Sequence, residues 1–328
     1  MTNHPATPPL FVGLDVGGTK IEGILVDAQR RLLAQTRRPT RPARPADLLD
    51  DLRTAVSTLL QQAQAQPTDL AAIGMGVPGQ VIPQTGVVRL AANLNLADYP
   101  LGPALTAVCH TPVALENDVR AAAVGVQHGL QTQTPVQNLA YVSLGTGVAA
   151  GLVLNGRLYR GSHGLAGEIG HVIVEPDGYV CNCGARGCLE TIVSGPAIVR
   201  QALAAGFAPP EEPPHAGHVY AAAAQGDPAA QRVVAHVSRA LALALQSLLM
   251  TCDVEKVVLG GGVTAVGPAF FTPLLAALAG LRAQSALLTE LLNEDKIMLL
   301  PAGYNPGTWG AVLLAGERLE TGDWGLGK

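Results

Sequence analysis

The order of apolar and polar residues predicts two β-hairpins, each closed by a glycine-containing turn. In the first, Leu10–Asp15 and Lys20–Asp27 are expected to form strands on either side of the turn at residues 17–19. Two apolar runs joined by Gly-Gly are typical of a hairpin. The second hairpin is expected over Asn138–Asn155, with its turn at residues 145–147.

The rest of the chain alternates between short apolar runs, which predict buried strands, and apolar residues at helical spacing, which predict helices. Such strands are expected at Ala71–Val77, Pro112–Leu115 and Lys256–Leu259, and helices at Asp47–Gln64, at Ala229–Met250, at Thr308–Glu320 and from Asp118 to about Gln127, ending near Gly129. Ala197–Pro228 is expected to be rich in loop, because prolines cluster at positions 209–214. Strands that alternate with helices predict an α/β fold.

The two hairpins resemble each other at a constant offset of 128 residues, which aligns Gly17 with Gly145 and Gly23 with Gly151. That spacing is too long for a solenoid repeat and indicates a duplicated domain. Two lobes would then each offer a glycine turn to one ligand between them. The alternative is coincidence, since glycine hairpins are common.

Composition narrows the class of protein. The chain has 328 residues, 48% of them hydrophobic and 14% charged, which indicates a folded protein of about two domains. With 21 basic and 25 acidic residues and no basic run, it has no feature of a nucleic-acid-binding surface. The longest apolar stretch, Ala240–Leu249, is too short to span a membrane, and the N-terminus has no secretory pattern. We therefore expect a cytoplasmic globular enzyme.

The first glycine turn has features of a phosphate-binding loop. Gly17 and Gly18 let backbone N–H groups approach an anion, Thr19 adds a hydroxyl donor and Lys20 adds a positive charge. Asp15, at the strand end, is an acceptor and would hold Mg²⁺ or its water. The alternative is a tight turn without a ligand.

Two more glycine stretches support the phosphate interpretation. Gly145-Thr146-Gly147 has no paired carboxylate, because Ser143 aligns with Asp15, so one lobe would supply the metal carboxylate while both lobes hold phosphates. The residues Gly260, Gly261 and Gly262 follow a predicted strand, where they could lie close to a flat base or a ribose.

A histidine and three cysteines have the pattern of a metal site: His171, Cys181, Cys183 and Cys188. Three thiolates and one imidazole suit tetrahedral Zn²⁺, and four protein ligands leave no open position, so the ion would be structural. The odd number of cysteines and their clustering favour a metal over disulfides. Cys109 and Cys252 are expected to be core residues.

Two carboxylates lie beside this cluster in the sequence. Glu168 comes three residues before His171, and Glu190 comes two residues after Cys188. Carboxylates held by a rigid ion suit the vicinal hydroxyls of a sugar, and a zinc-bound imidazole can donate through its second nitrogen. The alternative is that both are solvated loop charges or partners of the metal ligands.

Asn117 and Asp118 end a predicted strand and begin a helix. Asn and Asp are favoured helix N-caps, so capping is one interpretation. The other makes Asp118 a general base that takes a hydroxyl proton during phosphoryl transfer, which needs mainly positioning and charge neutralisation.

Together these motifs resemble those of the ROK family (repressor, open reading frame, kinase), whose sugar kinases have a two-lobed actin-like ATPase, or ribonuclease H-like, fold. The resemblance runs from about Leu10 to the end and rests on Asp15–Lys20, Glu116–Asp118, Gly164–His171 and the segment Cys181-Asn-Cys-Gly-Ala-Arg-Gly-Cys-Leu-Glu190. The long zinc-loop signature is the most specific of these motifs.

The resemblance implies a role for each motif. Asp118 would activate the sugar 6-hydroxyl, and the sugar would be bound by Gly79, Asn93, Asn117, Asp118, Glu168, His171 and Glu190. ATP with Mg²⁺ would be bound by Asp15, Gly17, Gly18, Thr19, Lys20, Gly145, Thr146, Gly147 and Gly260–Gly262. His171, Cys181, Cys183 and Cys188 would hold structural Zn²⁺. Members are commonly dimers, or tetramers.

The family's lobes would here be residues 1–118 with a closing helix at about 309–328, and residues 119–308. One departure is the stretch Gly147-Val-Ala-Ala-Gly151, which has alanine at two places where the family usually has glycine. Another is the region of Ala97–Tyr99, where an aromatic residue often follows the Asn-Leu pair; it leaves the choice of sugar open.

Three functions compete. The first is an ATP-dependent hexokinase acting on glucose, because Ala166–His171 resembles the glucokinase-type signature, although kinases for N-acetylmannosamine and N-acetylglucosamine share nearly all of it. The second is a sugar-responsive repressor, which would need a DNA-binding domain ahead of Asp15, where only 14 residues stand. The third is a sugar-binding module without catalysis, in which Asp118 only caps a helix.

Overall fold

The computed structural model describes residues 9–41, 43–131 and 135–322. The last six residues of the closing helix expected at about 309–328 therefore lie outside the described residues. Contacts divide the chain into unit 1, which is Met1–Pro135 with Gly303–Lys328, and unit 2, which is Val136–Ala302. This division differs from the one expected after Asp118. Helix α3 (Asp118–Gln131) packs against α10 (Pro306–Thr321), and both helices therefore belong to unit 1.

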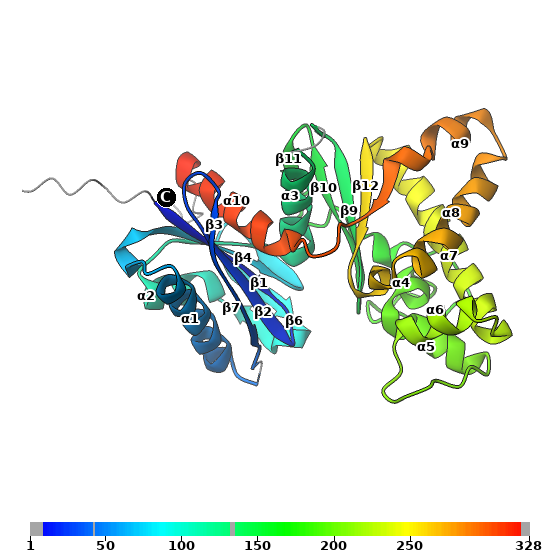
Figure 1. Ribbon diagram of the computed structural model, residues 1–328, viewed down its shortest axis with the longest axis horizontal. Helices are drawn as coiled ribbons and strands as arrows, with labels where there is room; N and C mark the ends of the chain where they lie inside the picture. The colour runs from blue at the N-terminus through cyan, green and yellow to red at the C-terminus, as the bar shows by residue number, and fades with distance from the viewer. Residues whose placement is uncertain (1–8, 42, 132–134, 323–328) are drawn as a thin grey trace, which may run out of the picture. The chain divides into compact units, whose positions relative to one another are not determined.

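Unit 1 is built on a five-stranded sheet in the order β3-β2-β1-β4-β8 (Figure 1). β1 pairs antiparallel with β2 and parallel with β4, which pairs parallel with β8. The strands are β1 (Leu10–Val16), β2 (Lys20–Val26), β3 (Leu32–Pro39), β4 (Leu70–Val77) and β8 (Val113–Asn117). β3 was not predicted, because it is an edge strand with exposed polar residues and lacks a clear apolar run.

The remaining elements of unit 1 cover this sheet or extend from it. They are α1 (Pro45–Gln62), η1 (Pro67–Asp69), η2 (Ala92–Leu94), α2 (Leu101–Cys109), and a small antiparallel sheet of β5 (Gln80–Ile82), β6 (Val87–Ala91) and β7 (Leu96–Tyr99). α10 packs against β1, β4 and α3. The described part of helix α3 ends at Gln131, two residues after Gly129, near which the sequence predicted its end. A Cβ at Gly129 would lie 3.1 Å from the ring of Tyr304.

Glycines let α10 approach its neighbours closely. A Cβ at Gly310 would lie 1.7 Å from the carbonyl oxygen of Ala121 in α3, and one at Gly74 in β4 would lie 1.8 Å from that of Ala311 in α10. Both contacts are with backbone, which cannot rotate away as a side chain can. The α3–α10–β4 packing therefore depends on the absence of side chains at these positions.

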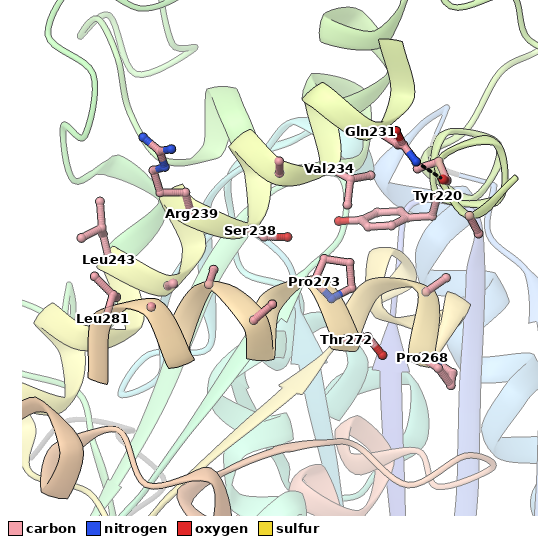
Figure 2. Close-up of a pocket in the computed structure, with 18 of the residues that line it drawn as sticks. Tyr220, Gln231, Val234, Ser238, Arg239, Leu243, Pro268, Thr272, Pro273 and Leu281 are labelled. Carbon is pink, nitrogen blue, oxygen red and sulfur yellow. Dashed lines mark hydrogen bonds between the residues drawn. The ribbon is translucent and has the colours of Figure 1, made fainter. Parts of the chain in front are cut away.

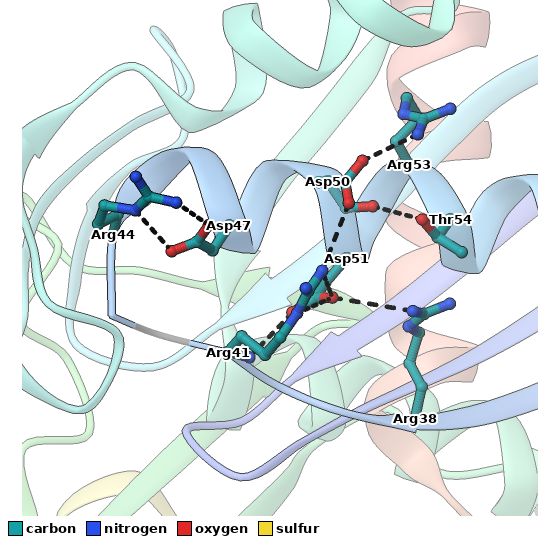
Figure 3. Close-up of polar contacts among 8 residues, drawn as sticks. All are labelled: Arg38, Arg41, Arg44, Asp47, Asp50, Asp51, Arg53 and Thr54. Atoms are coloured by element: carbon teal, nitrogen blue, oxygen red, sulfur yellow. Dashed lines mark hydrogen bonds and ion pairs between the residues drawn. The ribbon is translucent and has the colours of Figure 1, made fainter.

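Charged residues fasten the start of α1 to the segment before it (Figure 3). Asp51 is buried and accepts hydrogen bonds from the Arg41 backbone N–H at 2.9 Å and from its guanidinium Nη2 at 2.6 Å. Arg38 approaches the same carboxylate at 3.8 Å. These contacts compensate for the burial of a carboxylate on the apolar face of the helix.

Unit 2 is built on a sheet of the same plan, in the order β11-β10-β9-β12-β13. β9 pairs antiparallel with β10 and parallel with β12, and β12 pairs parallel with β13, so each unit has a hairpin followed by two parallel strands. The strands are β9 (Leu139–Leu144), β10 (Val148–Leu154), β11 (Arg157–Tyr159), β12 (Lys256–Gly260) and β13 (Ile297–Leu299). The shared plan supports the duplicated domain that the hairpins predicted.

The strand registers correct the constant offset of 128 residues. Val16 pairs with Ile21 across the first turn, whereas the residue aligned with Val16, Leu144, pairs with Val148 across the second. The second turn is therefore one residue shorter, and its second strand is displaced by one position. The residue matching Gly23 in the sheet is Ala150, not Gly151.

Helices pack against this sheet to form the core of unit 2 (Figure 1). They are η3 (Ile169–His171), α4 (Glu190–Val193), α5 (Gly195–Ala204), α6 (Ala216–Ala224), α7 (Pro228–Cys252), η4 (Gly262–Val266), α8 (Pro268–Arg282), α9 (Ala286–Leu291) and η5 (Glu294–Lys296). The loop expected within Ala197–Pro228 is present around the proline cluster, at residues 205–215. The rest of that segment is mostly helical, because α5 and α6 flank the loop and bury apolar side chains that include Ile198 and Tyr220.

Helix α7 is long and apolar enough to cross a membrane by length and composition, but 56% of its apolar window is buried inside unit 2. It behaves as a core helix. Between α7 and α8 lies a pocket of about 960 Å³, with Tyr220 of α6 at one end (Figure 2). Seven of the 19 residues that line it are alanines, and Pro273 interrupts the hydrogen bonding within α8 beside it. It contains none of the residues that the sequence predicted for a site.

Candidate functional site

The first glycine turn is a tight loop held by backbone and side-chain hydrogen bonds. The Gly17 N–H donates to the Lys20 carbonyl at 2.8 Å, and the Thr40 hydroxyl donates to the Gly17 carbonyl at 2.7 Å. A Cβ at Gly18 would lie 2.9 Å from the Asn93 backbone oxygen. The turn therefore lies directly against the Asn93 loop, which the sequence assigned to the sugar. Lys20 forms an ion pair with Glu22 at 3.0 Å.

Asp15, at the end of β1, is surrounded by acidic groups and by closely packed backbone. A Cβ at Gly307 would lie 2.7 Å from the Asp15 carboxyl carbon, so only glycine fits there. Burial raises the pKa of Asp15 to about 7, and the negative charges of Asp118 and Glu22 add to that shift. A divalent cation would offset this repulsion, so the position suits a Mg²⁺ ligand.

Asn117, not Asp118, caps helix α3. Its side-chain oxygen accepts from the Arg120 N–H at 3.1 Å, and its amide nitrogen donates to the Gly79 carbonyl at 3.1 Å. Gly79 has φ +89°, and a Cβ there would lie 2.1 Å from the Leu90 carbonyl oxygen, so this loop needs glycine. Asp118 accepts from the adjacent Val119 N–H at 2.9 Å. Asn117 is therefore the residue in the cap position of α3, and Asp118 also accepts from an N–H of the first turn.

The second glycine turn connects to Glu190. The Gly145 N–H donates to the Gly147 carbonyl at 3.0 Å, and the Gly195 N–H, at the start of α5, donates to the Gly145 carbonyl at 2.8 Å. The Glu190 carboxylate accepts from the Val148 N–H at 2.9 Å. One oxygen of Glu190 thus has a structural role at the second glycine turn, which the sequence did not predict.

The segment that carries Glu168 folds back onto β10. The Ala150 N–H donates to the Gly167 carbonyl at 2.7 Å, and a Cβ at Gly170 would lie 2.1 Å from the Val148 carbonyl oxygen. These close approaches explain the glycines on both sides of Glu168, whose side chain is exposed. An exposed carboxylate on a fixed backbone suits the binding of hydroxyl groups.

The cysteine cluster has the spacing of a tetrahedral metal site. Sulfur Sγ of Cys183 lies 3.7 Å from that of Cys188, and Nδ1 of His171 lies 3.6 Å from Sγ of Cys181. Around a tetrahedral Zn²⁺ with ordinary bond lengths, two sulfurs lie about 3.8 Å apart and a nitrogen and a sulfur about 3.6 Å apart. The ligand atoms of the four residues all lie within 4.8 Å of one another, so they could hold zinc.

Burial raises the pKa of the Cys188 thiol to about 12, and the neighbouring thiols add to that shift. Without a cation the thiol keeps its proton, and a bound zinc ion would displace it. The donor set therefore fits zinc in both geometry and chemistry.

The third glycine stretch lies against the second turn. A Cβ at Gly261, which has φ +94°, would lie 2.4 Å from the Leu144 carbonyl oxygen, and one at Gly260 would meet the ring of Tyr141. A Cβ at Gly262 would meet no described atom within 4 Å. The stretch thus leaves Gly262, at the start of η4, open toward a ligand.

The structure groups the predicted residues within each unit. In unit 1 they are Asp15, Gly17–Lys20, Gly79, Asn93, Asn117 and Asp118; in unit 2 they are Gly145–Gly147, Glu168, His171, Glu190, Gly260–Gly262 and the three cysteines. Asn305 and Gly307 were missed, although Asn305 caps α10 and contributes a hydrogen bond to Asp15. An Asn before a Pro is a helix-start signal, and it could have predicted that α10 begins at Pro306 and not at Thr308.

The chain matches the ROK family over residues 11–318. The glucokinase of Halalkalibacterium halodurans is 33% identical over 277 residues, which cover 80% of this chain and 83% of that protein. The N-acetylmannosamine kinase of Citrobacter koseri is 34% identical over 262 residues, which cover 77% of this chain and 83% of that protein.

Among solved structures, a ROK family glucokinase from Streptomyces griseus, in complex with glucose and AMPPNP, is similar with a TM-score of 0.75 and 30% identity. The match covers 94% of this chain and 99% of that one. The family match, the sequence identities and the similar structure agree with the motifs and with the two five-stranded sheets of the same plan described above. The chain therefore belongs to the ROK family and has an actin-like ATPase fold.

Proposed function

We propose that this protein transfers the γ-phosphoryl group of ATP to the 6-hydroxyl of a hexose, with glucose as its preferred substrate. The observation that carries the proposal is the pairing of Asp118 with Asp15 in unit 1. Asn117 occupies the cap position of α3, and the charge of Asp118 acts on Asp15, beside the first glycine turn. A base and a metal carboxylate next to a phosphate-binding turn are what phosphoryl transfer requires.

In this reaction Asp118 accepts the proton of the sugar 6-hydroxyl, whose oxygen forms the new bond to the γ-phosphorus while the bond to the ADP oxygen breaks. The Gly17–Lys20 turn and the Gly145–Gly147 turn hold the phosphates through backbone N–H groups, and Gly260–Gly262 lie against the adenosine. Asp15 would hold Mg²⁺, which neutralises phosphate charge when bound. Asp118 remains the residue that moves the proton.

We assign the sugar hydroxyls to Gly79, Asn93, Asn117, Glu168, His171 and Glu190. Support comes from the contacts that hold these residues in place: Asn117 bonds to Gly79, and Gly18 lies against Asn93. His171, Cys181, Cys183 and Cys188 would hold a structural zinc ion that fixes the backbone carrying Glu168 and Glu190. In this assignment zinc orients the sugar contacts and takes no part in the chemical step.

Two substrates compete within this proposal. The glucokinase of Halalkalibacterium halodurans supports glucose, whereas the N-acetylmannosamine kinase of Citrobacter koseri, which is equally similar, supports an N-acetylhexosamine. A coupled assay of ADP release with ATP and Mg²⁺, across hexoses and N-acetylhexosamines, distinguishes them. The highest kcat/KM with glucose supports the proposal, and a higher kcat/KM with N-acetylmannosamine assigns the second substrate. The absence of turnover with any sugar would contradict the assignment of kinase activity.

We further propose that the protein is a cytoplasmic homodimer, and light scattering tests its oligomeric state.

A further inference from the structure

Unit 2 contains a second group of metal-binding side chains, separate from the cysteine cluster. Glu211 and His215 lie in the proline-rich segment before α6, and His218 lies in the first turn of that helix. One ligand atom from each of the three residues lies within 4.8 Å of the others. We propose that Glu211, His215 and His218 bind a divalent transition-metal ion, with a water molecule as its fourth ligand.

The distances are close to those of a coordinated ion. Nε2 of His218 lies 3.1 Å from Oε1 of Glu211, whereas a nitrogen and an oxygen bound to one tetrahedral ion lie about 3.3 Å apart. An ion can therefore enter between these two atoms with a shift of a few tenths of an ångström. The ring of His215 lies over that of His218 at a tilt of 37°, with centroids 3.6 Å apart, and it turns to direct a nitrogen at the ion. His215 is exposed, so it has room to do so.

The local backbone positions the two imidazoles on one side of the helix start. A Cβ at Gly217 would lie 2.8 Å from Nδ1 of His215, so glycine is what allows that ring to fold over the first turn of α6. The His215 N–H to His218 Nδ1 distance is 3.5 Å, the limit of a hydrogen bond. Little is therefore lost when coordination at Nε2 leaves the proton of His218 on Nδ1.

The donor set defines the kind of ion. Two imidazoles and one carboxylate suit Zn²⁺, Co²⁺, Ni²⁺ or Cu²⁺ rather than Mg²⁺ or Ca²⁺, which prefer oxygen ligands. Three protein ligands leave an open position, unlike the four-ligand cysteine cluster. Because the site has no thiolate, Co²⁺ bound there gives d–d absorption without sulfur-to-metal charge transfer, which distinguishes the two sites in one sample.

A bound ion would tie the proline-rich segment to α6. Helix α6 packs against α7 and against η4, the helix that starts at Gly262. Since the metal binds only the folded arrangement of these three residues, it should also stabilise unit 2 against unfolding. Neither effect requires kinase activity, so the proposal stands or falls separately from the assigned function.

The test is a titration of full-length protein whose cysteine cluster has been loaded with one equivalent of Zn²⁺. Added Co²⁺ should bind as a second equivalent, with d–d absorption, no thiolate charge transfer and a higher melting temperature. Loss of an outer-shell partner weakens metal binding roughly 10–100-fold, so removal of a direct ligand in Glu211→Gln or His218→Ala should weaken the second equivalent at least as much.

Matched controls are Glu212→Gln, the exposed neighbour outside the group, and His110→Asn, an exposed histidine in unit 1; both should bind the second equivalent as the wild type does. All four substitutions are at partly or fully exposed side chains, and circular dichroism checks that the variants fold. A wild type that takes up only the first equivalent overturns the proposal. So does a second equivalent that Glu211→Gln and His218→Ala retain unchanged.

Discussion

The Glu190 carboxylate accepts a hydrogen bond at 2.9 Å from the backbone N–H of Val148, the residue that directly follows the second glycine turn. Glu190 also follows Cys188 by two residues, so the cysteine cluster and the turn are connected through a single side chain. A bound zinc ion would thus position the turn that we assign to phosphate as well as the residues assigned to the sugar.

Removal of a zinc ligand should therefore affect metal and sugar together. In Cys183→Ser we expect loss of bound zinc and a large rise in the glucose dissociation constant, because the backbone carrying Glu168 and Glu190 is no longer fixed. Metal analysis and isothermal titration with glucose check this. Cys252→Ser, at a half-buried cysteine outside the cluster, should keep zinc and sugar affinity. Normal glucose binding in a zinc-free Cys183→Ser sample would show that sugar binding does not depend on zinc.

Asp118→Asn should abolish most turnover while leaving the fold intact. Asn117 keeps its cap on α3, and an asparagine at position 118 still offers a side-chain oxygen to the Val119 N–H. Loss of a single general base usually lowers turnover by roughly 10²–10⁴. Steady-state kinetics with glucose and ATP measure the loss, with exposed Asp295→Asn as the control. Turnover close to that of the wild type would rule out the assigned role.

The pKa of Asp15 gives the ligand-free protein a pH-dependent stability. It rises from 3.8 to about 7 on folding, so the folded state binds more protons than the unfolded state between these values. Stability should fall as pH rises through this range, and the penalty is complete above pH 7. Asp15→Asn removes it and should stabilise the ligand-free protein at pH 8 by up to about 4 kcal/mol, which is the free energy that corresponds to about three pKa units.

Thermal unfolding at pH 5 and pH 8 tests this. The gain of Asp15→Asn should shrink toward pH 5, while the same variant loses Mg-dependent activity. Exposed Asp177→Asn serves as the control and should show no such change. If Asp15→Asn is less stable than the wild type at pH 8, the charge of buried Asp15 does not destabilise the folded protein as predicted.

Glu168→Gln should raise the KM for sugar and leave that for ATP unchanged. Its exposed carboxylate lies on a backbone fixed by Gly167 and Gly170, and an amide accepts hydrogen bonds less strongly than a carboxylate. Initial rates with either substrate varied measure both constants, and exposed Glu290→Gln is the control. A rise in the KM for ATP alone would mean that Glu168 contacts the nucleotide and not the sugar.

Two helical glycines should respond in opposite directions to alanine. Gly310→Ala forces a Cβ to within 1.7 Å of the Ala121 carbonyl oxygen, and we expect a loss of about 3 kcal/mol or more. Gly280→Ala, in α8, meets no described atom within 4 Å and should gain about 0.5–1 kcal/mol from helix propensity. Urea unfolding measures both. If both substitutions changed the free energy of unfolding equally, α3 and α10 would be able to move apart at little cost.

Much of this protein could be predicted from local sequence. The hairpins, helix α7, the metal ligands and the family motifs depend on residue type and spacing, which the chain states directly. Edge strand β3 and helices α5 and α6 could not be predicted in the same way. A strand with exposed polar residues and helices rich in alanine show weak apolar periodicity. Their secondary structure is decided by packing against neighbouring elements.

What the sequence by itself determined is the chemistry: which carboxylates, thiols, imidazoles and glycine turns this protein has. Only the tertiary structure decided how that chemistry is distributed. It showed that Asn117 rather than Asp118 caps α3, that Gly307 leaves space for the Asp15 carboxyl, and that α3 belongs with α10. Those facts depend on contacts between residues far apart in the chain, which spacing along the sequence does not specify.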